Sequence, residues 1–359
     1  MDSTSDSDPT AGAADSSAKP STSLPEDGFS SCGIAVDPNH GDADSNEERL
    51  GATVQNSAMS LSESIMEFRK IYGRTFHNFN SDITQYWGPN DEKQNDHLDT
   101  NHAMLLIAMD NELFYSPIGD NPERVIDIGT GTGVWAVDFA DQFPSAEVIG
   151  TDLSPIQPSW VPPNCKFELD DAQLPWDYPD NYFDFVHMRL MMGSIKDWPA
   201  LYREAYRCLK PGGWIEHLDY DPRVMSDDGT IGPDSPWAKW GELFIEAGEK
   251  LQQSFSTVID HNSYNLLQEA GFENVQERRL KLPLGSWPAD PKWKAVGQLN
   301  LAATEKGLEG FALYILTHVH GWGLEETQVF LAFVRKELKN RKKHGYYMAA
   351  SVFGQKPMD

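Results

Sequence analysis

The stretch VIDIGTGTGVWA, residues 125–136, constrains the fold of this chain more than any other. Apolar residues and one aspartate lead into Gly129, Gly131 and Gly133, and a further apolar segment follows. A hydrophobic strand that ends in closely spaced glycines and opens a helix is typical of a ligand-binding turn, because glycine lets the backbone approach a ligand without a Cβ atom. This turn predicts an open parallel sheet whose ligand lies beyond the carboxyl ends of the strands.

From Arg124 onward, short apolar strands alternate with helices. The predicted strands are 124–128, 146–151, 165–169, 183–188 and 213–219. The predicted helices between them are 133–143, a short 155–160, a single turn at 171–174, and 198–209. Apolar strands separated by crossovers indicate a parallel sheet that is covered on both faces.

Helices dominate the flanking parts of the chain. Two are predicted before the sheet, at 60–79, which opens with a Ser-x-x-Glu pattern, and at 95–113, which has apolar residues on one face. After residue 221, helices are predicted at 235–255, 262–272, 290–317 and 324–341, and strands at 274–285 and 345–357. These insertions are long enough to form a helical cap over the sheet.

The chain is expected to divide into four segments. Residues 1–58 are predicted to be a disordered acidic tail, because they are rich in Ser, Asp, Gly and Pro and poor in apolar residues. An N-terminal helical segment that covers the ligand site is predicted at 59–122. A cofactor-binding core follows at 123–222, and a helical cap with the closing strands at 223–359.

Composition bounds the partners of the chain. The formal net charge of −26 repels nucleic-acid backbones and anionic membranes, so neither is an expected partner. No run of about 18 apolar residues and no signal-peptide pattern is present. The three cysteines form no C-x-x-C pair, and no His/Asp/Glu cluster has ligand spacing, so no metal site is expected. We expect a cytoplasmic protein, or a nuclear one if it is regulatory.

Three ligands compete for the glycine turn. A phosphate-binding loop would place Gly-Lys-Ser/Thr at its end, but Gly133 is followed by Val134 and Trp135. A dinucleotide turn would have the spacing G-x-G-x-x-G, and Asp127 would repel its pyrophosphate. S-adenosylmethionine has no phosphate and carries a sulfonium and an ammonium group, which Asp127 would attract.

Acidic residues at the next two strand ends suit an adenosine cofactor. Asp152, in VIGTDLS, is placed to accept both hydroxyls of a ribose, with Leu153 beside it. Asp171, followed by Ala172, is placed to accept a hydrogen bond from the adenine amino group. Met188 lies at the mouth of the fourth strand, in the run His187–Met188–Arg189, next to the expected methionine end.

Each of these residues also has a plainer structural interpretation. The glycines suit any tight turn between a strand and a helix, Asp152 could cap a helix, and Asp171 could simply stabilise a turn. His187 is more often a structural residue than a catalytic one in such a place. The occurrence of all four features in this order and spacing favours cofactor binding.

The motifs VIDIGTGTG, VIGTDLS, DDAQLPW and LKPGGWIE resemble those of class I S-adenosylmethionine-dependent methyltransferases. The chain also resembles the fungal LaeA-like methyltransferases. Residues 86–102, YWGPNDEKQNDHLDTNH, are similar to that family's Tyr-x-x-Pro-Asn-Asp-Glu segment and Leu-Asp-x-x-His helix, and the closing VFGQKP is similar too. The resemblance implies an α/β fold, a Rossmann-like seven-stranded, mostly parallel sheet with N-terminal helices and a helical cap insertion.

The resemblance also implies site residues. Gly129, Gly131 and Gly133 would line the cofactor loop, while Tyr86 would close over the cofactor from the N-terminal helices. Two positions depart from the family pattern. His97 replaces a basic residue before the Leu-Asp pair, and EHLDY (216–220) replaces a Glu-Leu-Gln-like strand ending, so the acceptor side differs while the cofactor side is intact.

Methyl transfer is an in-line displacement on an already activated cofactor, so the protein mainly orients the reactants. A base is needed only for an acceptor that still carries a proton. The candidates are His187, His217 and Asp219, each of which could equally be a structural polar residue. Aromatic side chains after residue 230 either line an apolar acceptor site or pack against the sheet: Trp237, Trp240, Phe244, Trp287 and Trp293.

Two functions of different class follow. The first is an enzyme that methylates a small molecule in fungal secondary metabolism. The second is a LaeA-type regulator of secondary-metabolite gene expression that acts with protein partners. A large, aromatic-lined cavity would favour the first, and a closed acceptor site with an exposed apolar patch would favour the second. A third interpretation is a cofactor fold that has lost its activity.

Overall fold

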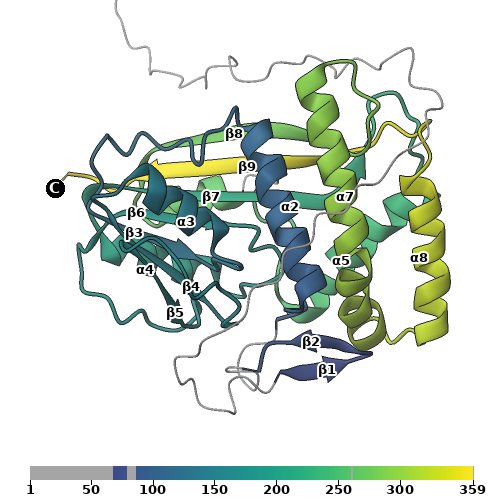
Figure 1. The fold of residues 1–359 in the computed structure, drawn as a ribbon, viewed down its shortest axis with the longest axis horizontal. Helices are drawn as coiled ribbons and strands as arrows, with labels where there is room; N and C mark the ends of the chain where they lie inside the picture. The colour runs from purple at the N-terminus through teal and green to yellow at the C-terminus, as the bar shows by residue number, and fades with distance from the viewer. Residues whose placement is uncertain (1–67, 79–85, 260–261, 359) are drawn as a thin grey trace, which may run out of the picture. The chain divides into compact units, whose positions relative to one another are not determined.

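The computed structural model describes residues 68–78, 86–259 and 262–358. The predicted acidic tail, 1–58, lies outside them. In chain order (Figure 1), the elements are β1 (Arg69–Ile71), β2 (Arg74–Phe76), α2 (Glu92–Ala108), β3 (Arg124–Ile128), α3 (Val134–Gln142), β4 (Glu147–Asp152), β5 (Cys165–Leu169), β6 (Phe183–Arg189), α4 (Trp198–Cys208), β7 (Leu209–Met225), α5 (Pro236–Leu251), α6 (Asn262–Glu269), β8 (Glu273–Pro283), α7 (Pro291–Tyr314), the π-helical turn η1 (Ile315–Val319), α8 (Leu324–Leu338) and β9 (Tyr346–Gln355).

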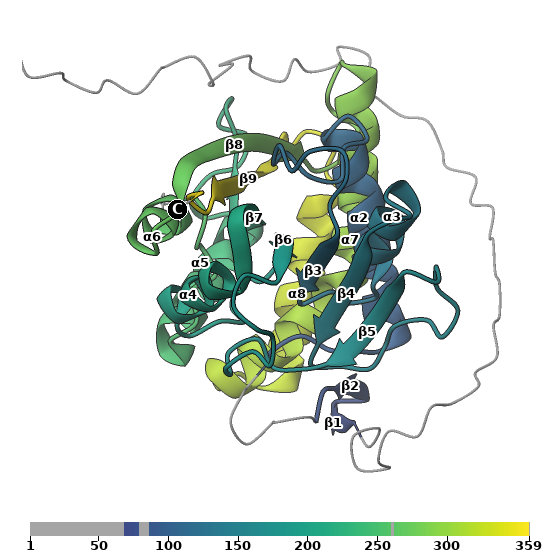
Figure 2. The same ribbon diagram turned by 90° about the vertical axis from the view of Figure 1, so that its left-hand side faces the viewer.

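The central sheet has seven strands in the order β5-β4-β3-β6-β7-β9-β8. Figure 2 shows this order across the sheet. β5, β4, β3, β6 and β7 are parallel to one another, and β9 runs antiparallel to both β7 and β8. The predicted seven-stranded, mostly parallel Rossmann-like sheet is therefore confirmed. The strand order reverses between β3 and β6, which is where open α/β sheets bind their ligands.

Alternating side chains of the strands bury both faces of the sheet. On β3, Val125 packs with α3, whereas Ile126 packs with α4 and α6 on the opposite face. α4 suits this position because its residues at helical spacing are apolar and buried, and because Asp197 caps its first turn by accepting from the Ala200 amide at 2.8 Å. α2 and α7 cover the same face as α3 farther along the sheet.

The helical cap packs on the C-terminal end of β7 and on the N-terminal end of β9, which lie side by side because the two strands are antiparallel. α5, α7 and α8 share one apolar cluster with Tyr347 of β9. Trp237, Trp240 and Phe244 lie in this cluster, and each has less than a tenth of its surface exposed. Trp287 is buried too. These aromatic side chains therefore pack the core, which was the second of the two interpretations open for them.

The predicted helix at 60–79 is wrong for the residues that the structure describes. Residues 69–76 form the antiparallel pair β1–β2, which is joined by Tyr72 and Gly73. Both have positive φ, 48° and 81°, as a tight two-residue hairpin turn requires. Gly73 favours this turn and disfavours a helix interior. The Ser-x-x-Glu pattern that suggested the helix lies outside the described residues.

Two further element predictions need correction. Residues 155–160 form a loop rather than a short helix, because Pro155 and Pro158 remove backbone donors that a helix needs. β7 extends from Leu209 to Met225, well beyond the predicted 213–219, because β9 pairs along it from Trp214 to Met225. No helix in the described part of the chain is long and apolar enough to cross a bilayer.

Candidate functional site

A cavity lies at the carboxyl ends of β3, β4 and β6, at the reversal of strand order. It holds about 1070 Å³, including the space of its open mouth, which is ample for a cofactor-sized ligand. The loops after β3, β4, β5 and β6 form one wall, and residues 86–98, from α2 and the segment before it, form another. Its described wall includes four aspartates and one arginine.

The glycine turn after β3 forms the floor of this cavity. Gly129 and Gly131 line it, with φ of 66° and 60°. A Cβ atom on Gly129 would lie 2.2 Å from the sulfur of Met191, so this position has no room for a side chain. The Gly131 amide donates to Oδ2 of Asp152 at 2.8 Å, which ties the turn to the end of β4.

Two of the predicted cofactor residues do not line the cavity. Gly133 is the N-cap of α3, and a Cβ atom there would lie 2.3 Å from the ring of Phe167, so it allows close helix packing. Met188 is fully buried in the core on the α4 side of the sheet. For both residues the structure offers a packing role, and their contact with a cofactor stays a prediction.

Asp127 lines the cavity and also supports the turn. Its Oδ2 accepts from the Thr130 hydroxyl at 2.6 Å, and its Oδ1 lies 2.7 Å from Nδ1 of His187. His187 stacks on Trp135 with ring centroids 3.6 Å apart and does not line the cavity. Burial, opposed by the charge of Asp127, lowers the pKa of His187 below its usual range. The imidazole is therefore neutral near pH 7 and donates from Nδ1 to Asp127.

Asp152 and Leu153 line the cavity at the end of β4. The Asp152 carboxylate accepts from the Ser154 amide at 2.9 Å as well as from Gly131. Each carboxylate oxygen can accept more than one hydrogen bond, so it retains capacity toward a ligand. Burial raises the pKa of the Asp152 carboxyl to about 6, against the lowering effect of the amide hydrogen bonds.

Asp171 and Ala172, the residues predicted to hold the adenine, line the cavity after β5, and their contact with a cofactor stays a prediction. Asp171 is almost fully buried, and its Oδ1 accepts from the Gln173 amide at 3.1 Å. This bond fixes the turn that replaces the predicted helical turn at 171–174. The Asp171 side chain therefore lies at the cavity end of β5. Its hydrogen bond to Gln173 stabilises the turn, whether or not a ligand is bound.

The segment that leads into α2 brings polar groups that the sequence had not singled out. Tyr86 lines the cavity as expected, and burial raises the pKa of its phenol well above its usual range, so the hydroxyl stays protonated. Asn90 and Gln94 line it as well and are more than nine-tenths buried. Asn90 Oδ1 and Gln94 Oε1 have no hydrogen-bond partner among the described residues. Buried acceptors of this kind fit a ligand that donates hydrogen bonds.

The Leu-Asp-x-x-His motif docks α2 onto the glycine turn. Leu98 packs against Gly131, and Asp99 accepts from the Thr132 hydroxyl at 2.6 Å. His102 lies one turn farther along the same face and contacts Arg189, which lines the cavity at the end of β6. The motif therefore connects α2 to two of the loops that form the cavity.

The predicted bases His217 and Asp219 lie in a buried polar cluster behind the cavity wall. Nδ1 of His217 lies 2.8 Å from the Tyr202 hydroxyl, and its Nε2 lies 3.4 Å from Oδ2 of Asp219. The imidazole also stacks on Trp198. Neither His217 nor Asp219 lines the cavity, so the structure does not bring the three predicted bases together at it. In the described ranges, no group of His, Cys, Asp and Glu is arranged to hold a metal ion.

Comparisons with known proteins identify relatives of the chain. A model described as a methyltransferase domain matches residues 101–277. The chain is 38% identical over 303 residues to the methyltransferase pytC of Aspergillus terreus, which covers 84% of this chain and 92% of that protein. It is 38% identical over 281 residues to the secondary metabolism regulator LAE1 of Cochliobolus heterostrophus, covering 76% and 90%. It is 35% identical over 292 residues to the regulator laeA of Monascus pilosus, covering 80% and 77%.

Proposed function

Because this chain belongs to the methyltransferase family, with the LaeA-like fungal proteins among its relatives, we propose that it transfers the methyl group of S-adenosylmethionine to a small molecule of fungal secondary metabolism. Relatives named as methyltransferases and relatives named as regulators match it about equally well. The choice of cofactor and acceptor therefore depends on the cavity.

The observation that carries the cofactor assignment is the chemistry of the cavity wall. Four aspartates and one arginine give it a net negative charge, which suits a ligand with a sulfonium and an ammonium group and opposes a pyrophosphate. The side-chain oxygens of Asn90 and Gln94, which have no partner among the described residues, add acceptors for hydroxyl or ammonium donors. The wall therefore fits S-adenosylmethionine better than a phosphorylated cofactor.

Each described wall segment has a role in this proposal. Gly129 and Gly131 let the backbone approach the cofactor, and Asp152 accepts from the ribose hydroxyls. Asp171, with Leu153 and Ala172, holds the adenine, and Tyr86 closes over the cofactor from the α2 side. When bound, S-adenosylmethionine supplies an activated methyl group, so the chain itself contributes mainly orientation and exclusion of water.

A general base is not part of the proposal. His187 is neutral and occupied by Asp127, while His217 and Asp219 interact with each other inside the core. None of the three lines the cavity. An acceptor that ionises readily, or one that loses its proton to water, fits this site better than one that needs a strong base. The predicted catalytic roles of these residues remain predictions.

A second candidate function, regulation through a protein partner, has its own supporting observation. α8, at the right-hand side of Figure 1, exposes Leu324, Val329 and Phe333, the last two by more than half of their surface. Val329 and Phe333 are four residues apart and so share one helix face. Tyr86 is the one aromatic residue in the described cavity wall, which weakens the expectation of an aromatic acceptor site.

Calorimetric titration with S-adenosylmethionine and S-adenosylhomocysteine tests the cofactor assignment. We expect the native chain to bind both and Asp152→Asn to bind at least tenfold more weakly. Asp120→Asn, at an exposed aspartate outside the cavity wall, is the matched control and should bind like the native chain. Absence of binding to the native chain would overturn the proposal.

The acceptor is tested with the methyl-labelled cofactor. Label transferred to a compound in a fungal metabolite extract supports the small-molecule proposal. Label found on the chain itself or on a co-purifying protein, with none in metabolites, would favour the regulatory function instead.

A further inference from the structure

Arg189 brings a positive charge to the cavity wall. It is the last residue of β6, and the chain then turns sharply at Leu190, whose φ is 56°. A positive φ at leucine is strained, and such strain is found where the surrounding structure fixes a functional position. The turn places both Arg189 and Met191 at the cavity.

Among the described residues, no carboxylate forms an ion pair with the guanidinium of Arg189. Its one hydrogen bond is from Nη2 to Nδ1 of His102, at 2.7 Å, and none of the described carboxylates lies within ion-pairing distance. Burial lowers its pKa to about 10, yet the group remains fully charged at neutral pH. Asp127 and Asp138 offset part of the desolvation cost without making an ion-pair contact. The remaining cost favours an anion from outside the chain beside the guanidinium.

A short relay of hydrogen bonds, from Arg189 to His102 and from His102 to Asp138, fixes the orientation of Arg189. Arginine can only donate, so Nδ1 of His102 must accept and carries no proton. The ring proton is therefore on Nε2, which lies 2.8 Å from Oδ2 of Asp138 and donates to it. His102 is almost fully buried. The relay joins β6, α2 and α3, and its histidine is the last residue of the Leu-Asp-x-x-His motif.

We propose that Arg189 binds the carboxylate at the amino-acid end of S-adenosylmethionine, and that His102 and Asp138 hold the guanidinium in place for it. This inference rests on the proposed function. Arg189 is the one cation among the described residues that line the cavity, it forms no ion pair with a described carboxylate, and one side of its guanidinium is anchored by His102. The remaining donors of the fork match the planar, two-oxygen shape of a carboxylate.

Two ligands that differ at this end provide the test. S-adenosylhomocysteine has the carboxylate, whereas 5′-deoxy-5′-methylthioadenosine keeps the adenosine and the sulfur but lacks the whole amino-acid end. We expect Arg189→Gln to weaken binding of S-adenosylhomocysteine by about 10- to 100-fold and to leave methylthioadenosine binding within about twofold. Arg189→Lys, which keeps the charge but loses the fork, should fall between Gln and the native chain.

The relay is tested by substitutions at His102. Gln can still accept from Arg189 and donate to Asp138, whereas Phe keeps the ring volume and loses both nitrogens. We expect His102→Phe to weaken S-adenosylhomocysteine binding by about 3- to 10-fold and His102→Gln to restore most of it. Methylthioadenosine binding should stay unchanged in both, which a merely structural defect would not allow.

The outcomes separate this inference from the proposed function. If the native chain binds neither ligand, the cofactor assignment itself fails. If it binds both and Arg189→Gln weakens them equally or not at all, the cofactor assignment stands and the role of Arg189 is overturned. In the second case, weaker turnover with an anionic acceptor only would assign the arginine to an acceptor carboxylate or phosphate instead.

Discussion

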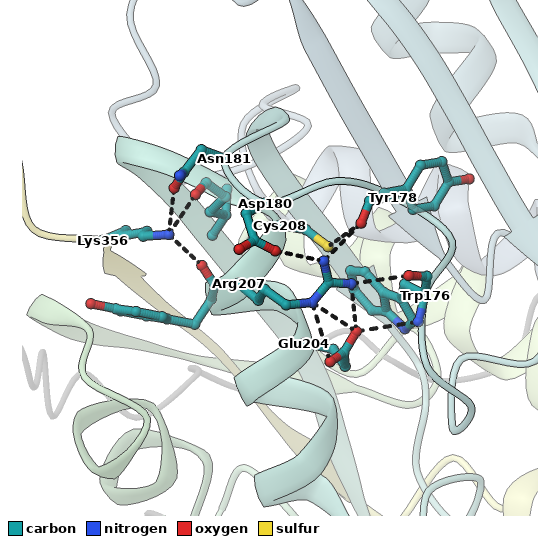
Figure 3. Close-up of polar contacts among 10 residues, drawn as sticks. Trp176, Tyr178, Asp180, Asn181, Glu204, Arg207, Cys208 and Lys356 are labelled. Carbon is teal, nitrogen blue, oxygen red and sulfur yellow. Dashed lines mark hydrogen bonds and ion pairs between the residues drawn. The ribbon is translucent and has the colours of Figure 1, made fainter.

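Two arginines at opposite edges of the same sheet have very different surroundings. Arg207 lies at the amino ends of β6 and β7, and Figure 3 shows its guanidinium between Asp180, Glu204 and backbone carbonyl groups. It donates to Tyr178 O at 2.8 Å and to Trp176 O at 3.0 Å in addition to the two carboxylates. Arg189, at the carboxyl end of β6, donates only to His102 among the residues that the structure describes.

The comparison separates polar groups that stabilise the fold from polar groups that remain available to a ligand. At the amino edge, Lys356 repeats the pattern of Arg207 and donates to the Asn181 side chain and two backbone carbonyls, each at 2.8 Å (Figure 3). At the carboxyl edge, Asn90 and Gln94 keep unpartnered oxygens within the described structure. Substitutions at the two edges should therefore affect different measurements.

The largest loss of stability is expected at Glu216, a saturated carboxylate in the middle of the sheet. It is 1% exposed and accepts from the amides of Tyr115 and Ser116 and from the hydroxyls of Ser116 and Ser351. Glu216→Ala leaves these donors buried without a partner, so the free energy of unfolding in urea should fall by about 3–5 kcal/mol. Glu216→Gln, which keeps one acceptor, should lose less, and equal losses would contradict this account.

Arg207→Gln should have the next largest effect on stability. The substitution removes the guanidinium group that joins the 176–180 loop to α4. The resulting loss of stability is reduced because the ion pairs are partly exposed. We expect the free energy of unfolding to fall by about 1–2 kcal/mol, with cofactor affinity unchanged. Arg207→Lys is the control and should lose roughly half as much. A fall in cofactor affinity would contradict the separation of the two edges.

Cofactor affinity should depend on pH through Asp152. Burial raises the pKa of this carboxyl to about 6, above the value in the unfolded chain, so its contribution to stability falls as pH rises from about 4 to 6. Binding changes in the opposite sense, because the ionised carboxylate is the better acceptor for ribose hydroxyls. S-adenosylhomocysteine affinity should rise about tenfold between pH 5 and pH 7. Asp152→Asn should show a flat profile; a slope in the variant would assign the effect to another group.

The smallest change in stability is expected for Arg189→Gln, and it tests the comparison of the two arginines most directly. Arg189→Gln removes a partly buried charge that makes no ion pair with the described carboxylates, so the free energy of unfolding should stay within about 0.5 kcal/mol of the native value or rise slightly. Urea unfolding of Arg189→Gln beside Arg207→Gln measures the difference directly. A loss at Arg189 as large as that at Arg207 would show that its bond to His102 stabilises the fold in its own right.

Most of the sheet could be predicted from the sequence, because each buried strand is a short apolar run bounded by turn residues. The hairpin at 68–78 could not, since Arg69 and Arg74 give it no apolar alternation and the Ser-x-x-Glu pattern upstream favoured a helix. The full length of β7 was missed for a different reason. Its extension to Met225 depends on pairing with β9, which lies more than 120 residues later in the chain.

In the site, too, residues placed by local sequence spacing could be predicted, whereas contacts between residues far apart in the sequence could not. Gly129, Gly131, Asp152 and Asp171 each lie at the end of a strand or within three residues of it, so local spacing was enough to bring them to one cavity edge. Arg189 bonds to His102, which is 87 residues away in the chain, and no local pattern reveals that none of the described carboxylates pairs with Arg189. His187 stood at a promising strand end, but side-chain alternation directs it behind the wall.

The position of β9 has a consequence for how the chain folds as it is synthesised. β9 follows every other described strand in the sequence, yet it lies between β7 and β8 and is buried along almost its whole length. While the ribosome is still making residues 346–355, β7 and β8 are exposed on the edges that β9 will later cover. The sheet can therefore be completed only after residues 346–355 have left the ribosome, and until then the nascent chain carries two unpaired strand edges that a chaperone would be expected to protect.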